Sequence, residues 1–146
     1  MIVVDASVLV TTLADDGADG DRARARLRGE RLTAPEGIDL EVVSAWRRLV
    51  TAGHLDVPRA QLALQDLGEL RLRRVSHRPL LARCWELREN LTIYDAAYVA
   101  LAEMLDVAFL TADTSLALAP GPRCQIELLA SVSPDPAAPA AGPCGS

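Results

Sequence analysis

Apolar residues follow two alternating spacings along the chain. Short runs rich in β-branched residues predict buried strands, whereas apolar residues that recur every three or four positions predict helices. The short runs predict strands over residues 2–4, 32–34, 72–76, 107–111 and 125–129. The longer spacing predicts helices over residues 6–14, 39–51, 58–70, 79–89, 92–105 and 114–119, and one more helix that begins at Asp21 as its N-cap. Strands that alternate with helices are typical of an α/β fold with a mostly parallel sheet between two helical layers.

The predicted helix over residues 92–105 has the clearest pattern. Tyr94 and Tyr98 are one helical turn apart, and two leucines continue the same apolar stripe. Small alanines beside this stripe permit close packing against a neighbouring element. We expect both tyrosines, together with Trp46 and Trp85, to lie in the core or at a dimer interface.

The 146 residues are enough for one domain, and the composition changes near the C-terminus. Four of the nine prolines fall after residue 130, together with alanine, glycine and serine. Such a segment has too few large apolar residues to bury a core. We expect a folded domain over residues 1–130 and a Pro/Ala-rich disordered tail over residues 131–146.

Cysteine usage and the N-terminal residues predict a cytoplasmic protein. Cys84, Cys124 and Cys144 are odd in number and form no C-x-x-C pair, which fits neither a disulfide framework nor a thiolate zinc site. Asp5 interrupts the first apolar run, which argues against a secretory signal. No apolar run approaches the ~18–20 residues of a membrane-spanning helix. We expect reduced thiols and no association with a membrane.

The charge balance argues against proteins that hold nucleic acid by bulk positive charge, because such domains are strongly basic. The chain has 15 basic residues, all of them arginine, against 20 acidic ones, for a net charge of −5. An acidic protein can still bind nucleic acid through a bound cation and a local group of arginines.

Four carboxylates stand at positions that the hydrophobic pattern does not explain. Asp5 ends the first predicted strand and Asp113 follows the fourth, so both lie at the carboxyl edge of a parallel sheet, where α/β proteins bind ligands. Glu41 and Asp95 lie in the first turns of two predicted helices and can converge on the same edge. Carboxylates that lie close together repel each other, and raised pKa values or a bound cation relieve the repulsion. Oxygen ligands of this type select Mg²⁺ or Mn²⁺.

Each of these acids also has a structural explanation. Asp5 and Asp113 can cap the helices that follow them, and Thr92 with Asp95 matches a capping box in which Asp replaces Glu. The helix dipole favours an acid such as Glu41 in a first turn. The spacing alone does not decide between a cation site and four helix-terminal acids.

Four short segments share an order and a spacing with a known family. They are Ile2-Val3-Val4-Asp5-Ala6-Ser7, Asp39-Leu40-Glu41-Val42, Tyr94-Asp95-Ala96-Ala97-Tyr98 and Leu110-Thr111-Ala112-Asp113. Together they resemble the PIN-domain family, and most closely the VapC-type toxins of bacterial toxin–antitoxin pairs. The resemblance covers about residues 1–130, and although each motif is weak alone, the four together are fairly specific.

The resemblance implies a PIN-like three-layer α/β/α sandwich and a metal-dependent endoribonuclease. It implies two sets of site residues: the catalytic, metal-binding quartet Asp5, Glu41, Asp95 and Asp113, and the supporting hydroxyls of Ser7 and Thr111. Asp5 and Asp95 would be the most direct Mg²⁺ ligands. Metal-activated water would cleave an RNA phosphodiester bond and leave a 5′-phosphate and a 3′-hydroxyl. The family also implies a small antitoxin of the VapB type and a homodimer.

The quartet changes the interpretation of the charge. Its members account for four of the five excess negative charges, so the rest of the chain is nearly neutral and leaves room for arginines that contact RNA. Arg71, Arg73 and Arg74 are the candidates, since the period of a strand places Arg71 and Arg73 on one face.

Other functions stay open at this point. A phosphatase of the haloacid-dehalogenase type also begins with a strand and an Asp, but it needs a second Asp where this chain has Ser7. A flap-type DNA nuclease would carry more acidic residues and additional DNA-binding elements. A non-catalytic PIN-like module would use its acidic groove only to bind an arginine-bearing partner, and metal-dependent RNase activity separates this module from an enzyme.

Overall fold

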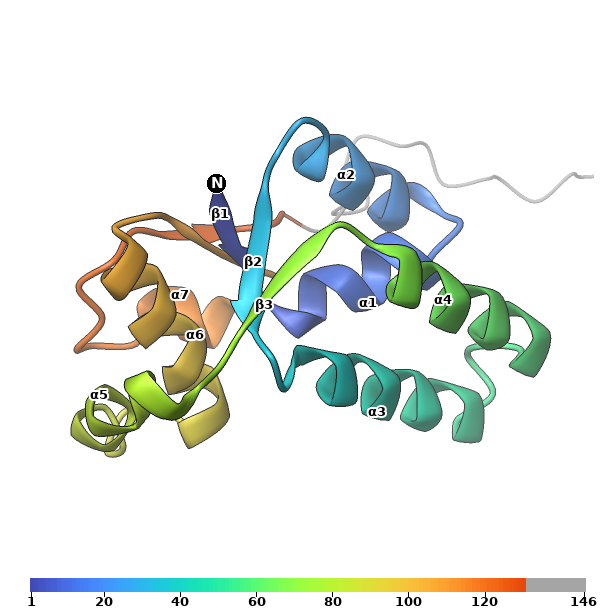
Figure 1. Ribbon diagram of the computed structural model, residues 1–146. Coiled ribbons are helices and arrows are strands. Elements are labelled where there is room, and N and C mark those ends of the chain that lie inside the picture. Colours follow the sequence, from blue (N-terminus) through green and yellow to red (C-terminus); the bar gives the residue numbers. More distant parts are fainter. Residues whose placement is uncertain (131–146) are drawn as a thin grey trace, which may run out of the picture.

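Strand β1 (Ile2–Val4) is the centre of a five-stranded sheet in which every pair of neighbours is parallel. The computed structural model describes residues 1–130 and is shown in Figure 1. The strand order is β3-β2-β1-β4-β5. The other strands are β2 (Leu32–Pro35), β3 (Leu72–Val75), β4 (Phe109–Thr111) and β5 (Ile126–Leu128).

The order of the strands reverses beside β1. The chain builds outward from β1 through β2 to β3, then returns to add β4 and β5 on the other side of β1. In open α/β sheets, ligands bind outside the carboxyl ends of the strands where such a reversal occurs. A ligand site is therefore expected at the carboxyl ends of β1 and β4.

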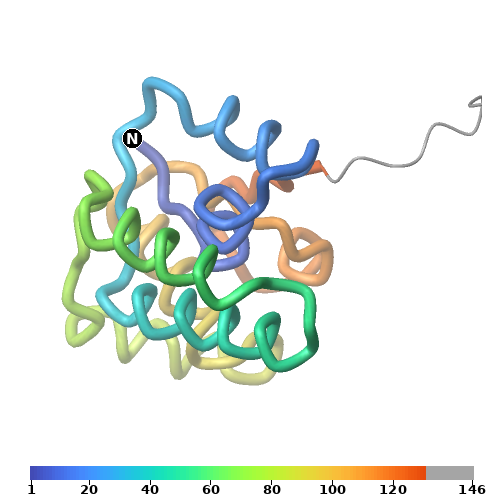
Figure 2. The backbone as a smooth tube through the Cα atoms, turned by 90° about the vertical axis from the view of Figure 1, so that its right-hand side faces the viewer, coloured from blue at the N-terminus to red at the C-terminus, as the bar shows by residue number. Residues whose placement is uncertain are grey.

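Helices cover both sides of the sheet, which confirms the predicted α/β/α arrangement. Helices α1 to α4 lie together on one side of the sheet and α5 and α6 on the other, and Figure 2 views the first group from the front. Helix α7 contacts β4 and β5. The helices are α1 (Ala6–Ala14), α2 (Ala18–Leu27), α3 (Ile38–Thr51), α4 (Val57–Glu69), α5 (Leu81–Glu86), α6 (Ile93–Leu105) and α7 (Thr114–Leu118), with a 3₁₀ turn η1 (Arg78–Leu80) before α5.

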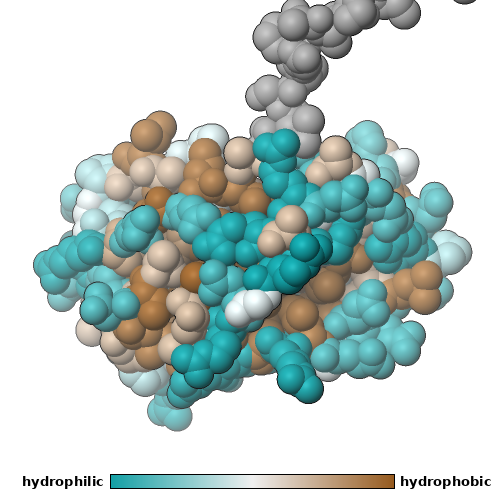
Figure 3. Space-filling view, turned by 90° about the horizontal axis from the view of Figure 1, so that it is seen from above, coloured by the Kyte–Doolittle hydropathy of each residue, from teal (hydrophilic) through white to brown (hydrophobic). Residues whose placement is uncertain are grey.

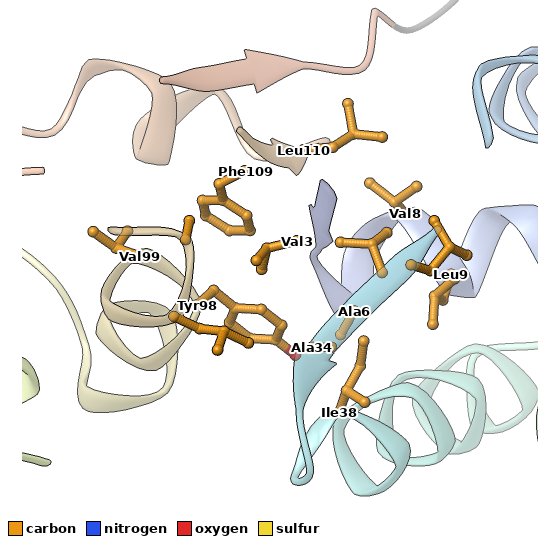
Figure 4. Packing of buried hydrophobic residues seen from close by; sticks show 14 of the residues in the cluster. Val3, Ala6, Val8, Leu9, Ala34, Ile38, Tyr98, Val99, Phe109 and Leu110 are labelled. Carbon is orange, nitrogen blue, oxygen red and sulfur yellow. The ribbon is translucent and has the colours of Figure 1, made fainter. Parts of the chain in front are cut away.

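The core is built mainly from aliphatic residues on both faces of β1 and β4. Val3 and Val4 are fully buried, as expected for a central parallel strand that is covered on both faces. Figure 4 shows how residues of α1, α3 and α6 pack around these strands. Tyr98 and Trp46 are buried here, which confirms their prediction as core residues.

Two of the predicted aromatic core residues are instead on the surface. Trp85 is 63% exposed and Tyr94 is 72% exposed in the single chain, so the core prediction is wrong for them. Trp85 lies near the end of α5, where the Arg88 guanidinium stacks 4.6 Å from its ring centroid. Their place at a dimer interface stays a prediction.

Helix α2 begins four residues earlier than predicted, with Gly17 and not Asp21 as its N-cap. It starts at Ala18, so Asp21 lies inside the helix. The Asp15 carboxylate accepts a hydrogen bond of 2.7 Å from the backbone N–H of Gly17, and this turn sets the start of the helix. The predicted helix over residues 79–89 is also shorter, because it begins as η1 and α5 ends at Glu86.

The arginines of α2 hold this helix to its neighbours. Arg24 donates to the backbone carbonyls of Thr12 and Asp15 at the end of α1. Arg26 forms a two-bond ion pair with Glu127 of β5, at 2.6 and 2.8 Å. Seen from above, on the side of α2, the surface carries a broad hydrophilic band between hydrophobic residues (Figure 3).

Within residues 1–130, no helix is both long and apolar enough to cross a membrane. Cys84 is buried and Cys124 is partly buried, and both are free thiols. Cys144 and the tail predicted over residues 131–146 lie outside the described residues.

Replacement of Gly20 by alanine is expected to destabilise the fold. A Cβ at this position would lie 1.8 Å from the backbone oxygen of Asp15, so α2 would have to move away from the end of α1. We expect Gly20→Ala to lower the free energy of unfolding by about 1–3 kcal/mol, as other overpacked sites do.

The matched control is Gly68→Ala in α4, where a new Cβ meets nothing within 4 Å. Alanine favours a helix over glycine, so this variant should be more stable by up to about 1 kcal/mol. Urea denaturation measures the free energy of unfolding of both variants. Equal changes in the two variants would contradict the close contact of Gly20 with the backbone of Asp15.

Candidate active site

Asp5 lies at the carboxyl end of β1 and is the most buried acid of the predicted quartet, with 6% of its surface exposed. It precedes α1, but its side chain makes no N-cap hydrogen bond to that helix, and the backbone N–H of Ala6 only opposes the rise in its pKa. Its Oδ2 instead accepts hydrogen bonds from the hydroxyls of Ser7, at 2.6 Å, and Thr111, at 2.8 Å. Helix capping therefore does not explain why a carboxylate is buried here.

The two hydroxyls join the ends of β1 and β4. Thr111 is fully buried at the end of β4, and its Oγ1 also accepts a hydrogen bond of 3.1 Å from the N–H of Asp113. The Ser7 hydroxyl accepts one of 3.1 Å from the N–H of Ala112. These bonds hold the backbone after β4 against the Asp5 carboxylate, at the place where the strand order reverses.

Glu41 approaches from the first turn of α3. Its carboxylate is half-buried and accepts a hydrogen bond of 3.0 Å from the hydroxyl of Tyr98 on α6. The start of α3 is held to the sheet by Arg74 of β3, which forms a two-bond ion pair with Asp39 at 2.6 and 2.8 Å. This pair restrains the helix turn that carries Glu41.

Asp95 and Asp113 complete the group from two helix N-termini. The backbone N–H of Asp95 donates to the hydroxyl of Thr92, which confirms Thr92 as the N-cap of α6. Asp113 is exposed, and its Oδ1 accepts hydrogen bonds from both the N–H and the hydroxyl of Ser115. Asp113 is thus the N-cap of α7, as the structural explanation predicts, and its Oδ2 stays without a hydrogen bond from the described residues.

The four carboxylates influence one another electrostatically. Burial raises the pKa of Asp5, and the negative charge of Asp113 adds to this increase. Burial also raises the pKa of Glu41, to which Asp5 and Asp95 contribute. The pKa of Asp95 is raised by burial and then by the charges of Asp5 and Asp113, against an opposing hydrogen bond from Thr92. The structure thus brings the predicted quartet into one electrostatically coupled group.

Within residues 1–130, the ion pairs described for the arginines do not involve this group. Among the described residues, the ion pairs of the arginines involve other carboxylates, such as Glu103, Glu127 and Asp39. A group of carboxylates that ranges from buried to exposed and has no basic partners attracts a cation, and oxygen donors suit Mg²⁺ or Mn²⁺. The donor set therefore fits a divalent cation of this type.

Over residues 1–130, no three Asp, Glu, His or Cys side chains are grouped so as to hold a metal ion. The four carboxylates are therefore a candidate donor set that is linked by electrostatic interactions, and not a closed coordination shell.

Tyr98 contacts the site, although the sequence pattern predicts for it only a place in the core or at an interface. Burial, followed by the charges of Glu41 and Asp5, raises its pKa, so the phenol is a neutral hydrogen-bond donor. Its position three residues after Asp95 places both on one face of the helix, which is a signal that the sequence contains.

The three predicted phosphate-contacting arginines differ in their surroundings. Arg74 is engaged by Asp39 and also donates to the backbone carbonyls of Leu67 and Leu72. Arg71 and Arg73 are exposed. RNA contact by these arginines stays a prediction, and the bonds of Arg74 give it a structural role in addition.

Comparison with known proteins agrees with the motifs. The PIN domain family matches the chain over residues 2–121. Ribonuclease VapC1 of Mycobacterium tuberculosis is 44% identical over 128 residues, which are 87% of this chain and 96% of that protein. Ribonuclease VapC12 of the same species is 38% identical over 130 residues, 89% of this chain and 100% of that protein.

Solved structures share the fold at low sequence identity. Mycobacterium tuberculosis VapC20, described as a toxin that cleaves the sarcin–ricin loop, has a TM-score of 0.63 at 16% identity and covers 81% of this chain and 94% of its own. A chain of a toxin–antitoxin complex from Klebsiella pneumoniae has a TM-score of 0.56 at 17% identity, with 80% of this chain and 90% of that chain covered. The matched family, the extent of the identity and the shared architecture agree, and the chain belongs to the PIN domain family, among its VapC ribonucleases.

Proposed function

We propose that this protein is a metal-dependent endoribonuclease toxin that a cognate antitoxin inhibits. One observation carries the proposal: four carboxylates that lie outside the ion pairs described for the arginines converge at the strand reversal of a PIN domain. Relatives that are 38–44% identical over most of the chain are named ribonucleases, which supports RNA as the substrate.

We assign the metal site to the quartet of Asp5, Glu41, Asp95 and Asp113. Asp5 and Asp95 are the most direct ligands, and Glu41 and Asp113 complete the shell or orient the attacking water. Ser7 and Thr111 hold one oxygen of Asp5, which restricts the carboxylate to one orientation. A divalent ion, with Mg²⁺ or Mn²⁺ as the candidates, supplies Lewis-acid chemistry when bound, since it activates water and stabilises charge that develops on the phosphodiester.

The buried and exposed members of the quartet have different tasks. Asp5 is anchored inside the fold and keeps its place when substrate arrives. Asp113 is at the surface with one oxygen unbonded, so it is the carboxylate that an approaching water or phosphodiester meets first. Cleavage leaves a 5′-phosphate and a 3′-hydroxyl.

The proposal includes partners and a location. A small antitoxin of the VapB type is the expected inhibitor, which agrees with the toxin–antitoxin complex among the structures of similar fold. A homodimer is expected, with the exposed Trp85 as a candidate interface residue. The protein acts in the cytoplasm, where its RNA substrate is found, and Arg71 and Arg73 are candidates for contact with that RNA.

Asp5→Asn is expected to abolish metal-dependent RNA cleavage while the fold is kept. The asparagine retains the shape of the side chain and an oxygen for the hydroxyls, but it removes the charge that a cation needs. We expect the rate of cleavage to fall by at least about 100-fold, which is the upper range for loss of a group that only supports a ligand. Cleavage mapping on total RNA, with EDTA and then with added Mg²⁺ or Mn²⁺, measures this effect for each protein.

The matched control is Asp66→Asn, which removes an exposed carboxylate from α4 and should cleave as the wild type does. Undiminished cleavage by Asp5→Asn would refute the assigned site. A wild-type protein that is free of its partner and cleaves no RNA with either metal would instead be a non-catalytic binding module.

The same substitution is expected to stabilise the protein when metal is absent. Because burial raises the pKa of Asp5, the folded state binds its proton more tightly than the unfolded chain does. The ionised carboxylate therefore lowers the free energy of unfolding above that raised pKa. Asp5→Asn should gain about 1 kcal/mol at neutral pH, and the gain should shrink as the pH falls through the raised pKa toward the unfolded value of about 3.9.

Urea denaturation in EDTA between about pH 4 and pH 8 measures the difference between the two proteins. Subtraction removes the contributions of the titrating groups that the charge of Asp5 does not influence, and the remaining difference includes its effect on Glu41 and Asp95. A difference that stays constant over this range would show that the pKa of Asp5 is not raised.

A further inference from the structure

Tyr98 belongs to the apolar core and also contacts a carboxylate of the quartet. It is fully buried on α6, and its ring stacks on Phe109 of β4, with centroids 5.6 Å apart and planes 10° from parallel. Figure 4 shows the side chain reaching from α6 toward β2 and the start of α3. A ring that packing fixes in this way holds its hydroxyl at a defined place, and the hydroxyl donates a hydrogen bond of 3.0 Å to Oε1 of Glu41.

Glu41 has few other restraints on its carboxylate. Among the described residues, Tyr98 is the one side chain that hydrogen-bonds it, and no arginine pairs with it. The negative charges of Asp5 and Asp95 lie close enough to repel it. A glutamate side chain has several rotatable bonds, so without the phenol this carboxylate would turn toward water.

The bonds made by the protein leave one oxygen of Glu41 available. The phenol occupies Oε1, and Oε2 accepts no hydrogen bond from the described residues. Asp5 likewise accepts these hydrogen bonds on one oxygen, since both supporting hydroxyls donate to Oδ2. Asp113 does the same, because Ser115 engages only Oδ1. In Glu41, Asp5 and Asp113, the hydrogen bonds described here thus go to only one of the two carboxylate oxygens.

We infer that Tyr98 is a positioning residue of the active site, whose hydroxyl fixes the Glu41 carboxylate so that Oε2 is presented to the metal ion. The inference rests on the proposed function and adds to it a residue outside the acidic quartet. Carboxylates that bind metal are commonly held by hydrogen bonds of this kind, and their loss weakens metal affinity or activity by about 10–100-fold.

The test compares Tyr98→Phe with Tyr94→Phe in the full-length protein. Both substitutions remove one phenolic hydroxyl from α6, but Tyr94 is 72% exposed and its hydroxyl makes no hydrogen bond to the described residues. Tyr98→Phe keeps the ring that stacks on Phe109. Calorimetric titration with Mn²⁺ in the absence of RNA measures metal binding, and RNA cleavage is measured over a range of Mn²⁺ concentrations.

We expect Tyr98→Phe to bind Mn²⁺ about tenfold more weakly than the wild type. Its cleavage should need correspondingly more Mn²⁺ and should recover at saturating Mn²⁺, with the KM for RNA unchanged. Tyr94→Phe should match the wild type in all three measurements. Because metal binding also stabilises the folded state, the calorimetric affinity of the folded protein, and not rescue of cleavage alone, distinguishes positioning from a role limited to stability.

A double-substitution cycle with Glu41→Gln identifies the residue through which Tyr98 acts. If the phenol acts through Glu41, Tyr98→Phe should cause no further loss in the Glu41→Gln protein. A full additional loss would overturn the inference, as would Mn²⁺ binding by Tyr98→Phe that equals that of Tyr94→Phe. If Tyr98→Phe does not fold, Glu41→Asp provides the test, because its shorter side chain withdraws the carboxylate from the Tyr98 hydroxyl. Unchanged Mn²⁺ binding by Glu41→Asp would also refute the inference.

The outcomes separate this inference from the proposed function. A wild-type protein without metal-dependent cleavage overturns both. A wild-type protein that cleaves RNA, beside a Tyr98→Phe variant with normal metal dependence, overturns the positioning role alone.

Discussion

The carboxyl group of Asp5, buried at the end of the central strand, constrains the structure around it. Burial of a charge is unfavourable unless hydrogen bonds compensate for it. Two hydroxyls donate to Asp5, and because Ser7 comes from α1 and Thr111 from β4, the same bonds join the two strands beside which the sheet order reverses. Burial still raises the pKa of Asp5. A cation bound beside this acid would favour its ionised form.

The acidic residues of this protein fall into two classes. Arg83 and Arg26 form ion pairs with Glu103 and Glu127, and these bonds lower the pKa of both glutamates. In the quartet, the pKa values of Asp5, Glu41 and Asp95 are raised, and burial is the main cause. Perturbed groups that gather in one place, away from the ion pairs that stabilise a fold, are typical of functional sites. The raised pKa values mean that the ionised acids of the quartet disfavour the folded state, whereas the arginine–glutamate ion pairs favour it. Residues placed for a function commonly reduce stability in this way.

The positions around the quartet combine structural and functional roles. Asp113 caps α7 and keeps an oxygen free, so capping and ligation do not exclude each other. Arg74 holds the first turn of α3 through Asp39, and Tyr98 belongs to the core while its hydroxyl reaches Glu41. The framework that stabilises the domain is therefore also the framework that orients the acids.

The sequence alone predicted the fold class, which the structure confirms, since strand and helix periods are local. Four motifs that keep their order along the chain also named the four acids, whose role as a metal site stays a prediction. The local signals of the sequence were weaker at element ends, and Asp21 resembled an N-cap although a turn at Gly17 starts the helix. Tertiary structure decided the rest. Which tyrosine of α6 is buried, which oxygen of each carboxylate is already bonded, and which arginine pairs with Asp39 all depend on contacts between elements that are distant in sequence. Such contacts have no period that can be read along the chain, because packing of the sheet and its helices creates them.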